Sequence, residues 1–357
     1  MLLAVVMSGT LVSVILLNDA RLESWPTATG EELSDAGRAG QSVEYRKGFI
    51  TENSPTRSVH APALVELSDG AVMAVWYGGE REGSRDVAIY ASWLSSAAGD
   101  WSPAEQIIER QRVANDLGVH IRKLGNAVLL AGDNREVWMF FVTASIGGWS
   151  TSHINMVHST DGGKTWGSTR RLVASPFLNI STLVKGRPFF YQDGSIGLPV
   201  YHELAGKFSE LLRLERDGTV RDKIRMTHGR HKIQPDIAII DDRAMLSVMR
   251  DTSDDRKVTQ MSSPDGGMTW SPLQQTVLPN PNSAVSISGD KTRLVLAFND
   301  SGEHRNPLSL AVSSDQGKSW NKIVDIESGP LREDNNKDEF SYPYLVLTRS
   351  GTYHLVY

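Results

Sequence analysis

One strand-like run of this chain ends in three neighbouring groups that could move protons. Residues 198–203 read LPVYHE and finish with a phenol, an imidazole and a carboxylate. Side chains alternate along a strand, so Tyr201 and Glu203 would face one side and His202 the other. The three groups could perform acid–base chemistry or bind a substrate. They could equally be hydrogen-bonded groups at the rim of a sheet.

A second stretch of this kind, residues 78–86 (GGEREGSRD), combines glycines with charged side chains. We expect either a catalytic loop, with Arg81 available to bind substrate, or a solvated hairpin tip. Residues 183–188 (LVKGRP) add Arg187 as a further candidate for substrate binding.

The elements that must position these groups are indicated by an internal repeat. The pattern S-x-D-x-G-x-[TS]-W occurs at residues 159–166, 263–270 and 313–320. Its Asp can accept bonds from backbone amides in a tight turn, its Gly can adopt positive φ, and its Trp can anchor the loop. Each copy follows an apolar, β-prone run, which places it in the hairpin after a strand.

The repeat length predicts the architecture. With a degenerate Arg-Asp-Gly turn, the repeat aspartates are Asp161, Asp217, Asp265 and Asp315, at steps of 56, 48 and 50 residues. About fifty residues make one four-stranded propeller blade. A worn copy occurs at residues 99–103, and residues 55–357 have room for six blades. We therefore predict an all-β chain folded as a six-bladed β-propeller.

In such a propeller, Arg250 and Arg305 would lie at one end of the central channel. Each follows an apolar strand and precedes a turn, at equivalent places in successive repeats. Two converging guanidinium groups would suit a carboxylate or a sulfate, which they can bind with paired hydrogen bonds. Alternatively, each arginine forms an ion pair at the rim.

Composition supports the β assignment and excludes several functions. The chain of 357 residues has 31 glycines, no cysteine and a net charge of −5, with its basic residues dispersed. Nucleic-acid binding has no support, and neither disulfides nor cysteine catalysis can occur. We expect no cofactor, no metal ion and a monomer.

The N-terminal residues are predicted to lie outside the propeller. Residues 2–17 are apolar but have no Lys or Arg before them, so residues 1–20 read as an uncleaved membrane anchor or a poorly formed signal. A buried strand or helix is the alternative. Residues 21–54 read as a linker, of which residues 43–50 could close the ring. We expect an extracytoplasmic location, with membrane attachment through residues 2–17.

The repeats resemble the Asp-boxes, or BNR repeats, of the sialidase (neuraminidase) superfamily. That resemblance implies a propeller in which three arginines hold the carboxylate of a sugar and a tyrosine, activated by a glutamate, is the nucleophile. By position, Arg250 and Arg305 resemble the second and third arginines. Residues 340–345 (FSYPYL) resemble the stretch around the nucleophile, which identifies Tyr342. Glu82 or Asp86 would be the acid.

Two positions depart from the pattern of the superfamily. The motif His60-Ala61-Pro62 stands where the first arginine would be. Gln234 stands where the activating glutamate would be, and an amide cannot take the proton of a tyrosine. Glu203 could supply the missing carboxylate.

We therefore expect a glycoside hydrolase that releases a terminal anionic sugar, such as sialic acid, from a glycan. The alternatives are a polysaccharide lyase acting on uronate chains, for which His60 would be an asset, and a carbohydrate-binding propeller without turnover. Trp149 lies beside two glycines and could be a platform for a sugar or a core or rim residue.

Overall fold

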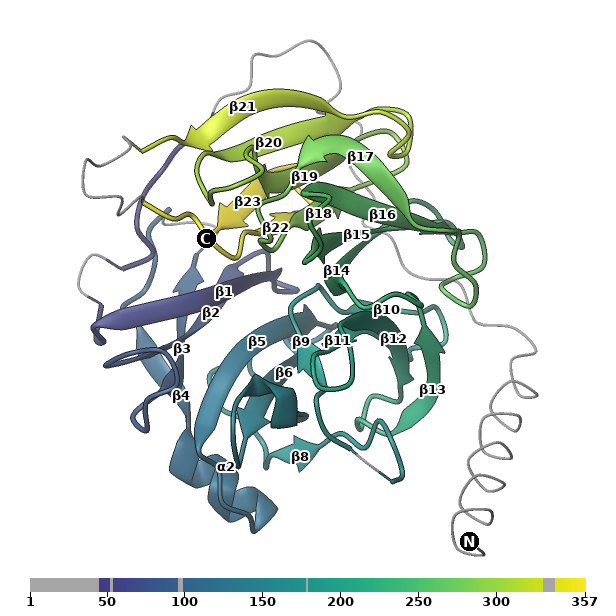
Figure 1. Cartoon of the computed structure of the whole chain (residues 1–357). Helices are drawn as coiled ribbons and strands as arrows, with labels where there is room; N and C mark the ends of the chain where they lie inside the picture. The colour runs from purple at the N-terminus through teal and green to yellow at the C-terminus, as the bar shows by residue number, and fades with distance from the viewer. Residues whose placement is uncertain (1–44, 52–53, 96–98, 178, 330–337) are drawn as a thin grey trace, which may run out of the picture.

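The computed structural model describes residues 45–51, 54–95, 99–177, 179–329 and 338–357. Its strands form successive antiparallel sheets arranged around a common axis (Figure 1). The first two sheets contain β1 (Ser58–Glu66), β2 (Val72–Gly79), β3 (Ala88–Leu94) and β4 (Glu105–Glu109), then β5 (Lys123–Ala131), β6 (Val137–Ala144), β7 (Ser152–Ser159) and β8 (Arg170–Arg171). The third contains β9 (Leu183–Val184), β10 (Phe189–Phe190), β11 (Ile196–His202), β12 (Phe208–Leu214) and β13 (Val220–Arg225).

The fourth and fifth sheets contain β14 (Lys232–Ile239), β15 (Met245–Asp251), β16 (Lys257–Ser263) and β17 (Gln274–Pro279), then β18 (Ser286–Gly289), β19 (Leu294–Asn299), β20 (Leu308–Ser313) and β21 (Asn321–Glu327). The last sheet is the hairpin of β22 (Tyr344–Leu347) and β23 (Tyr353–Val356). In the described residues the helices are α2 (Arg110–Leu117) and the 3-10 turn η2 (Trp149–Thr151).

The chain is an all-β propeller, as predicted, but its sixth sheet differs from the prediction. Five sheets have four or five strands, whereas the sixth has only two in the described part of the chain. Strand β22 lies between β18 and β1, so the hairpin completes the ring (Figure 1). Residues 45–51 contain no strand; Lys47 instead bonds to the carbonyl of Ile326 (3.2 Å) and pairs with Glu327 (3.1 Å).

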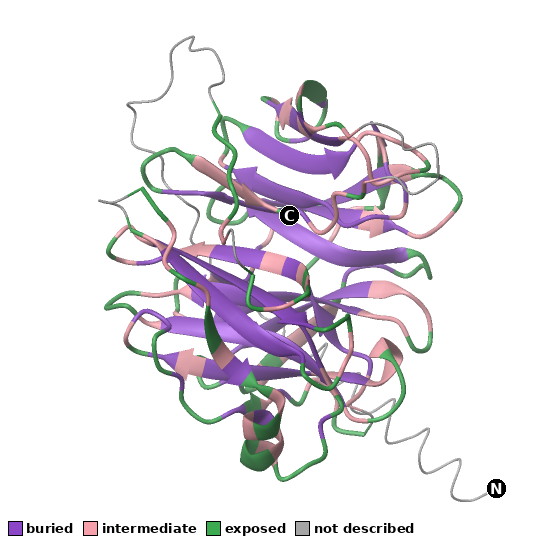
Figure 2. Cartoon of the chain, turned by 90° about the vertical axis from the view of Figure 1, so that its left-hand side faces the viewer, coloured by how far each residue is buried: buried purple, intermediate pink, exposed green. Residues whose placement is uncertain are grey.

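The core lies between neighbouring sheets. Every residue of β2 and of β6 is buried, whereas the outer strand β13 is half-exposed. Figure 2 shows the general contrast between buried strands and exposed turns and loops. Since the second strand of a blade is covered on both faces by the adjacent blades, it reads as a continuous apolar run. The inner strands are the first of each blade, and their ends line the two openings of the channel.

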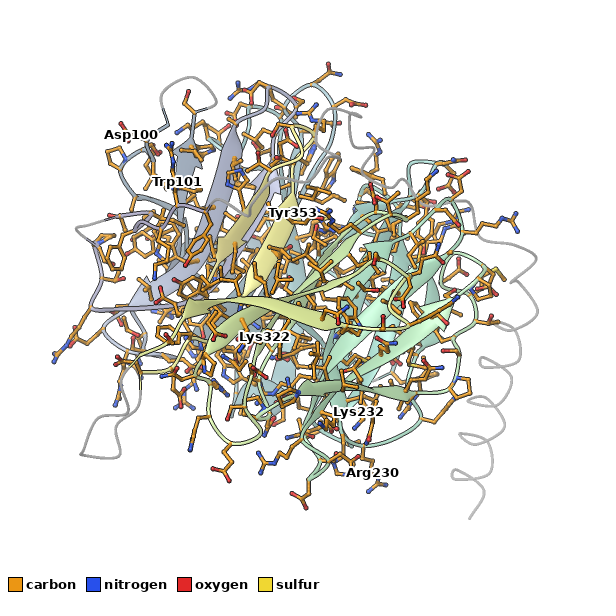
Figure 3. The ribbon with its side chains drawn as sticks, turned by 90° about the horizontal axis from the view of Figure 1, so that it is seen from above. Asp100, Trp101, Arg230, Lys232, Lys322 and Tyr353 are labelled. Atoms are coloured by element: carbon orange, nitrogen blue, oxygen red, sulfur yellow. The ribbon has the colours of Figure 1, made fainter. Side chains whose placement is uncertain are left out.

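The repeated Asp turns lie in the hairpin after a strand, as predicted, and the structure shows that they join the third and fourth strands of their blades. In the turn at residues 263–270, Asp265 accepts bonds from the Ser263 hydroxyl (2.9 Å), the Thr269 N–H (2.8 Å) and the Thr269 hydroxyl (2.6 Å). The same bonds occur around Asp161 and Asp315. The worn copy containing Asp100 and Trp101 lies at the periphery (Figure 3). These turns build the fold and stay away from the channel.

The predicted N-terminal hydrophobic segment, residues 1–20, and most of the linker lie outside the described residues. Among the residues that are described, no helix has the length and apolar character needed to cross a membrane.

Candidate active site

One cavity of about 80 Å³ opens where the inner strands begin. It gathers polar side chains from five of the six sheets and their loops. Seven of the residues singled out from the sequence line it: Glu82, Trp149, Tyr201, Glu203, Gln234, Arg250 and Tyr342. The rest of the wall is Tyr77, Asn126, Val142 and Leu183.

The backbone is bent at the start of several inner strands. Non-glycine residues take positive φ at Ala61 (47°), Gln234 (55°), Asn282 (59°) and Tyr342 (57°). Each such residue costs of order 1–3 kcal/mol, a strain that concentrates at functional sites. Of these four, Gln234 and Tyr342 line the cavity, and Asn282 contacts Arg250, so the strain falls where the candidate site is built.

Arg250 is held by two amides. Its Nε donates to Oδ1 of Asn282 (2.7 Å), and Nη1 donates to Oε1 of Gln234 (3.4 Å). Among the described residues no carboxylate lies within ion-pair distance of Arg250. Its positive charge is therefore available to an anionic ligand in the cavity.

Arg305 lies next to this cavity rather than in it. It lines an adjoining hollow with Asn282, the residue that also holds Arg250. Its Nη1 donates to the Ser341 hydroxyl (3.0 Å) and lies 3.8 Å from Glu339. Because a carboxylate partly neutralises it, Arg305 is less available than Arg250 to a ligand.

Three tyrosines surround the cavity. Burial raises the pKa of Tyr77 and of Tyr201 far above the usual value, and nearby carboxylates, Glu82 and Glu203 respectively, raise it further. Both phenols therefore stay protonated and can donate hydrogen bonds. Tyr201 accepts a bond from Nε2 of Gln234 (3.4 Å). Tyr342 differs from these two in being only half-buried.

His60 contacts Tyr342 from the first sheet. The two rings meet edge to face at 4.6 Å, and the His60 ring is 5.5 Å from Tyr77. Its Nε2 is 4.0 Å from Glu82. Burial lowers the pKa of His60, although the charge of Glu82 acts in the opposite direction. The position that the superfamily pattern gives to an arginine thus holds a ring that is neutral at pH 7.

Four predicted site residues lie elsewhere: Arg81, Asp86, Arg187 and His202. His202 points away from Tyr201 and Glu203, stacks on Phe208 (4.4 Å) and bonds to Glu210 (2.6 Å). This follows from the alternation along β11. In the loop before β3, the carboxylate of Asp86 accepts the N–H of Glu80 (2.7 Å), while Arg81 is exposed; neither lines the cavity.

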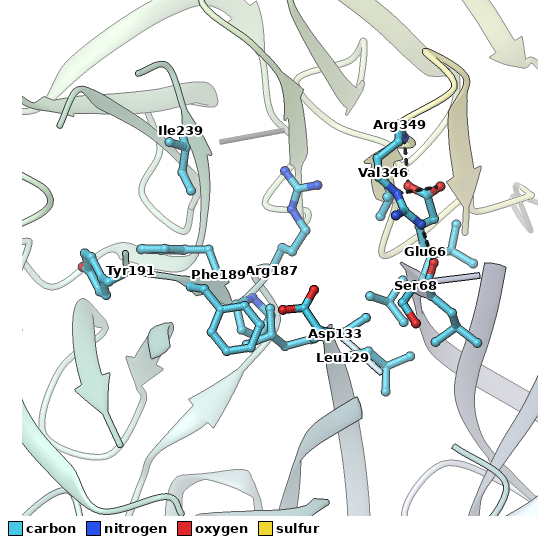
Figure 4. A pocket seen from close by; sticks show the side chains of 18 of the residues that line it. Glu66, Ser68, Leu129, Asp133, Arg187, Phe189, Tyr191, Ile239, Val346 and Arg349 are labelled. Carbon is cyan, nitrogen blue, oxygen red and sulfur yellow. Dashed lines mark hydrogen bonds and ion pairs between the residues drawn. The ribbon is translucent and has the colours of Figure 1, made fainter. Parts of the chain in front are cut away.

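Arg187 is separated from the site by the length of the channel. It lines a cavity of about 490 Å³ at the other ends of the inner strands, where its side chain projects toward the centre (Figure 4). Leu183 borders the candidate site, and a strand advances by about 3.3 Å per residue. Four residues later the chain has crossed to the far opening, so Arg187 cannot bind the same ligand as Arg250.

Lys185 occupies the middle of that crossing. It is 4% exposed, and its Nζ donates to the carbonyls of Val285 (2.6 Å) and Pro343 (2.8 Å). Burial lowers the pKa of Lys185 to about 8, although the charge of Asp236 acts to raise it. Because Pro343 follows Tyr342, this lysine fixes the segment that presents the tyrosine.

Sequence reasoning missed Tyr77 and Asn126, since both lie within runs that read as apolar strands. The bulge between Leu124 and Ala127, which displaces Asn126, has no clear sequence signal. No group of three or more His, Asp or Glu side chains that could hold a metal ion occurs among the described residues.

Comparison with known proteins identifies the family. Residues 70–355 match the model of the BNR repeat-like domain. No curated protein is similar enough in sequence to match. Similar solved structures include the Hadza microbial sialidase Hz136, with 16% identity, a TM-score of 0.67, and coverage of 82% of this chain and 61% of that one. This chain therefore spans less than two thirds of the length of that sialidase.

Two further structures share the fold at 12% identity. The NanB sialidase of Streptococcus pneumoniae has a TM-score of 0.70, with 90% of this chain and 69% of that one covered. The leech intramolecular trans-sialidase has a TM-score of 0.65, with 88% and 67% covered. The chain belongs to the BNR repeat-like family and shares its fold with these sialidases.

Proposed function

We propose that this protein is a glycoside hydrolase that releases a terminal anionic sugar from a glycan. The observation that supports this most is that one cavity brings a half-buried phenol together with two carboxylates and an arginine that has no carboxylate partner among the described residues. Those groups are Tyr342, Arg250, Glu82 and Glu203. The sialidases among the similar structures make a sialic acid the leading substrate.

Each group has a role in the proposed reaction. Arg250 binds the carboxylate of the sugar, with Arg305 and His60 beside it. The oxygen of Tyr342 attacks the anomeric carbon while Glu203 accepts the phenolic proton. The glycosidic bond breaks, and Glu82 donates a proton to the departing oxygen. Water, deprotonated by Glu82, then attacks the anomeric carbon; the bond between the sugar and the Tyr342 oxygen breaks, and Glu203 returns its proton to that oxygen. A neutral phenol suits this substrate because it does not repel the sugar carboxylate.

The contact between His60 and Tyr342 favours a second candidate, a lyase acting on uronate chains. A neutral imidazole next to a phenol could take the proton α to the uronate carboxylate while Arg250 stabilises the developing charge. The bond from the β carbon to the glycosidic oxygen then breaks, and the Tyr342 phenol donates a proton to the departing oxygen. The product would carry a carbon–carbon double bond instead of an added water.

The two reactions are separated by their products. We expect the protein to release the fluorophore from an α-sialoside and to give no rise in absorbance at about 235 nm on uronate chains. A rise in absorbance without fluorophore release would establish the lyase, and sugar binding with neither signal would leave a carbohydrate-binding propeller.

The tyrosine is tested by removing its hydroxyl. Tyr342→Phe should lower kcat by at least about 10³-fold, since it deletes the nucleophile but little of the packing. Tyr90→Phe is the matched control: in the described part of the chain, the phenol of Tyr90 bonds only to Gln106 (3.2 Å), and the rate of this variant should equal that of the wild type. Equal rates for Tyr342→Phe and the wild type would exclude Tyr342 from the mechanism.

We propose that the hairpin of β22 and β23 is a reduced sixth blade. Secretion across a membrane, with the N-terminal segment as signal or anchor, stays a prediction, and so does a monomeric state.

A further inference from the structure

A lysine and a tryptophan lie together at the edge of the candidate site. The Nζ of Lys123 is 5.6 Å from the centre of the Trp149 ring, and Trp149 lines the cavity with Glu82. A Cβ on Gly125 would lie 2.6 Å from the indole, so the absence of a side chain there lets the ring pack onto β5. The indole is thus held in place as a flat wall.

This pair lies on the side of Glu82. A Cβ on Gly83, the residue after Glu82, would lie 3.1 Å from the Nζ of Lys123. A general acid must reach the oxygen of the departing sugar. Since the proposed acid is next to Lys123, the departing sugar would lie against Trp149 and Lys123.

Lys123 differs in its charged neighbours from the lysine of a similar lysine–tryptophan pair elsewhere in the chain. Lys164 lies 3.3 Å from the centre of the Trp93 ring, but it also pairs with Glu105 (3.1 Å). Within the described ranges, Lys123 has no carboxylate at ion-pair distance. The charge of Lys164 is therefore compensated by a carboxylate of the protein, whereas the charge of Lys123, at the cavity, is available to a ligand.

We propose that Trp149 and Lys123 form a subsite for the departing sugar, selective for one that carries an acidic substituent such as a sulfate or a carboxylate. The apolar face of the sugar would stack on the indole, and its anionic group would bind the ammonium of Lys123. The assignment to the departing sugar rests on the hydrolase proposed above. The binding of an acidic sugar by these two residues does not.

Binding is measured without turnover, by titrating the full chain with three monosaccharides in ligand-observed NMR. The probes are N-acetylglucosamine, its 6-sulfate and methyl glucuronide. We expect the wild type to bind the two anionic probes more tightly than the neutral one. Lys123→Met should weaken only the anionic probes, by about tenfold. Sulfate and carboxylate selectivity are distinguished by which anionic probe loses more.

The matched control is Lys164→Met, which should leave all three affinities unchanged. Trp149→Ala should weaken every probe, and Trp149→Phe should restore part of the loss while keeping the packing. Two results would overturn the subsite: equal affinity of the wild type for neutral and anionic probes, or loss of anionic binding in Arg250→Met but not in Lys123→Met. A wild type that binds acidic sugars through Lys123 but hydrolyses no glycoside would retain the subsite and refute the hydrolase.

Discussion

Tyr342 is held in a strained conformation by a lysine that is itself costly to bury. Its φ of 57° is uncommon for a large side chain, and the next residue, Pro343, cannot donate a backbone hydrogen bond. The bond from Lys185 to the Pro343 carbonyl compensates by fixing this turn. Lys185 therefore links the stability of the channel to the geometry of the tyrosine.

The buried lysine predicts a pH dependence of stability. Its pKa is about 8 in the folded chain and 10.5 ordinarily, so between these values the unfolded chain binds the proton and the folded chain does not. The free energy of unfolding should therefore rise with pH in this window, by up to roughly 3 kcal/mol from this group. The charged and aromatic neighbours are Asp236 and Tyr344.

Urea unfolding of the wild type and of Lys185→Met from pH 7.5 to 10.5 measures this effect as a difference. The titration of Tyr77 and Tyr201 acts in the opposite direction above pH 10, but it is common to both proteins and cancels. Parallel curves for the two proteins would show that Lys185 keeps its ordinary pKa. The control Lys232→Met removes another buried lysine, labelled in Figure 3, which is paired with Asp251 (2.6 Å).

At the scale of the element, the Asp turns are a folding device. Asp265→Ala removes three hydrogen bonds within one hairpin and should lower the free energy of unfolding by roughly 2–3 kcal/mol. The rate of any catalysed reaction per folded molecule should not change, because the turn is remote from the cavity. Thermal unfolding measures the change in stability, and steady-state kinetics measures the rate per folded molecule. A lower rate per folded molecule in Asp265→Ala would mean that this turn affects the geometry of the site.

Elements were easier to predict than the site that they build. The turns gave the repeat length and the propeller because their pattern is local, and alternation placed Tyr201 and Glu203 together. The differences from the prediction occur along the inner strands. Arg187 lies at the opposite opening from Arg250 because four residues of a strand cross the whole channel. Asn126 was not predicted because a bulge, which the sequence alone does not reveal, turns it to the cavity.

At the scale of the molecule, the ring is closed by contacts between two segments that lie far apart in the sequence. Arg349, after β22, donates from its backbone N–H to Glu66 (2.8 Å) and from its guanidinium to the carbonyl of Leu67 (2.7 Å). Arg349→Ala should speed amide hydrogen exchange in β22 and β23 while exchange in β6 stays slow. The control Arg221→Ala removes an exposed pair with Glu215 (3.2 Å) and should alter neither region.

Exchange that accelerates equally in all sheets would instead mean that the ring opens only by complete unfolding. In both cases, closure of the ring would complete the candidate site. During synthesis on a ribosome, the five larger sheets emerge before Tyr342 and the hairpin that follows it. A nascent chain that has folded these sheets still lacks the proposed nucleophile, so the ring and the candidate site would be completed together.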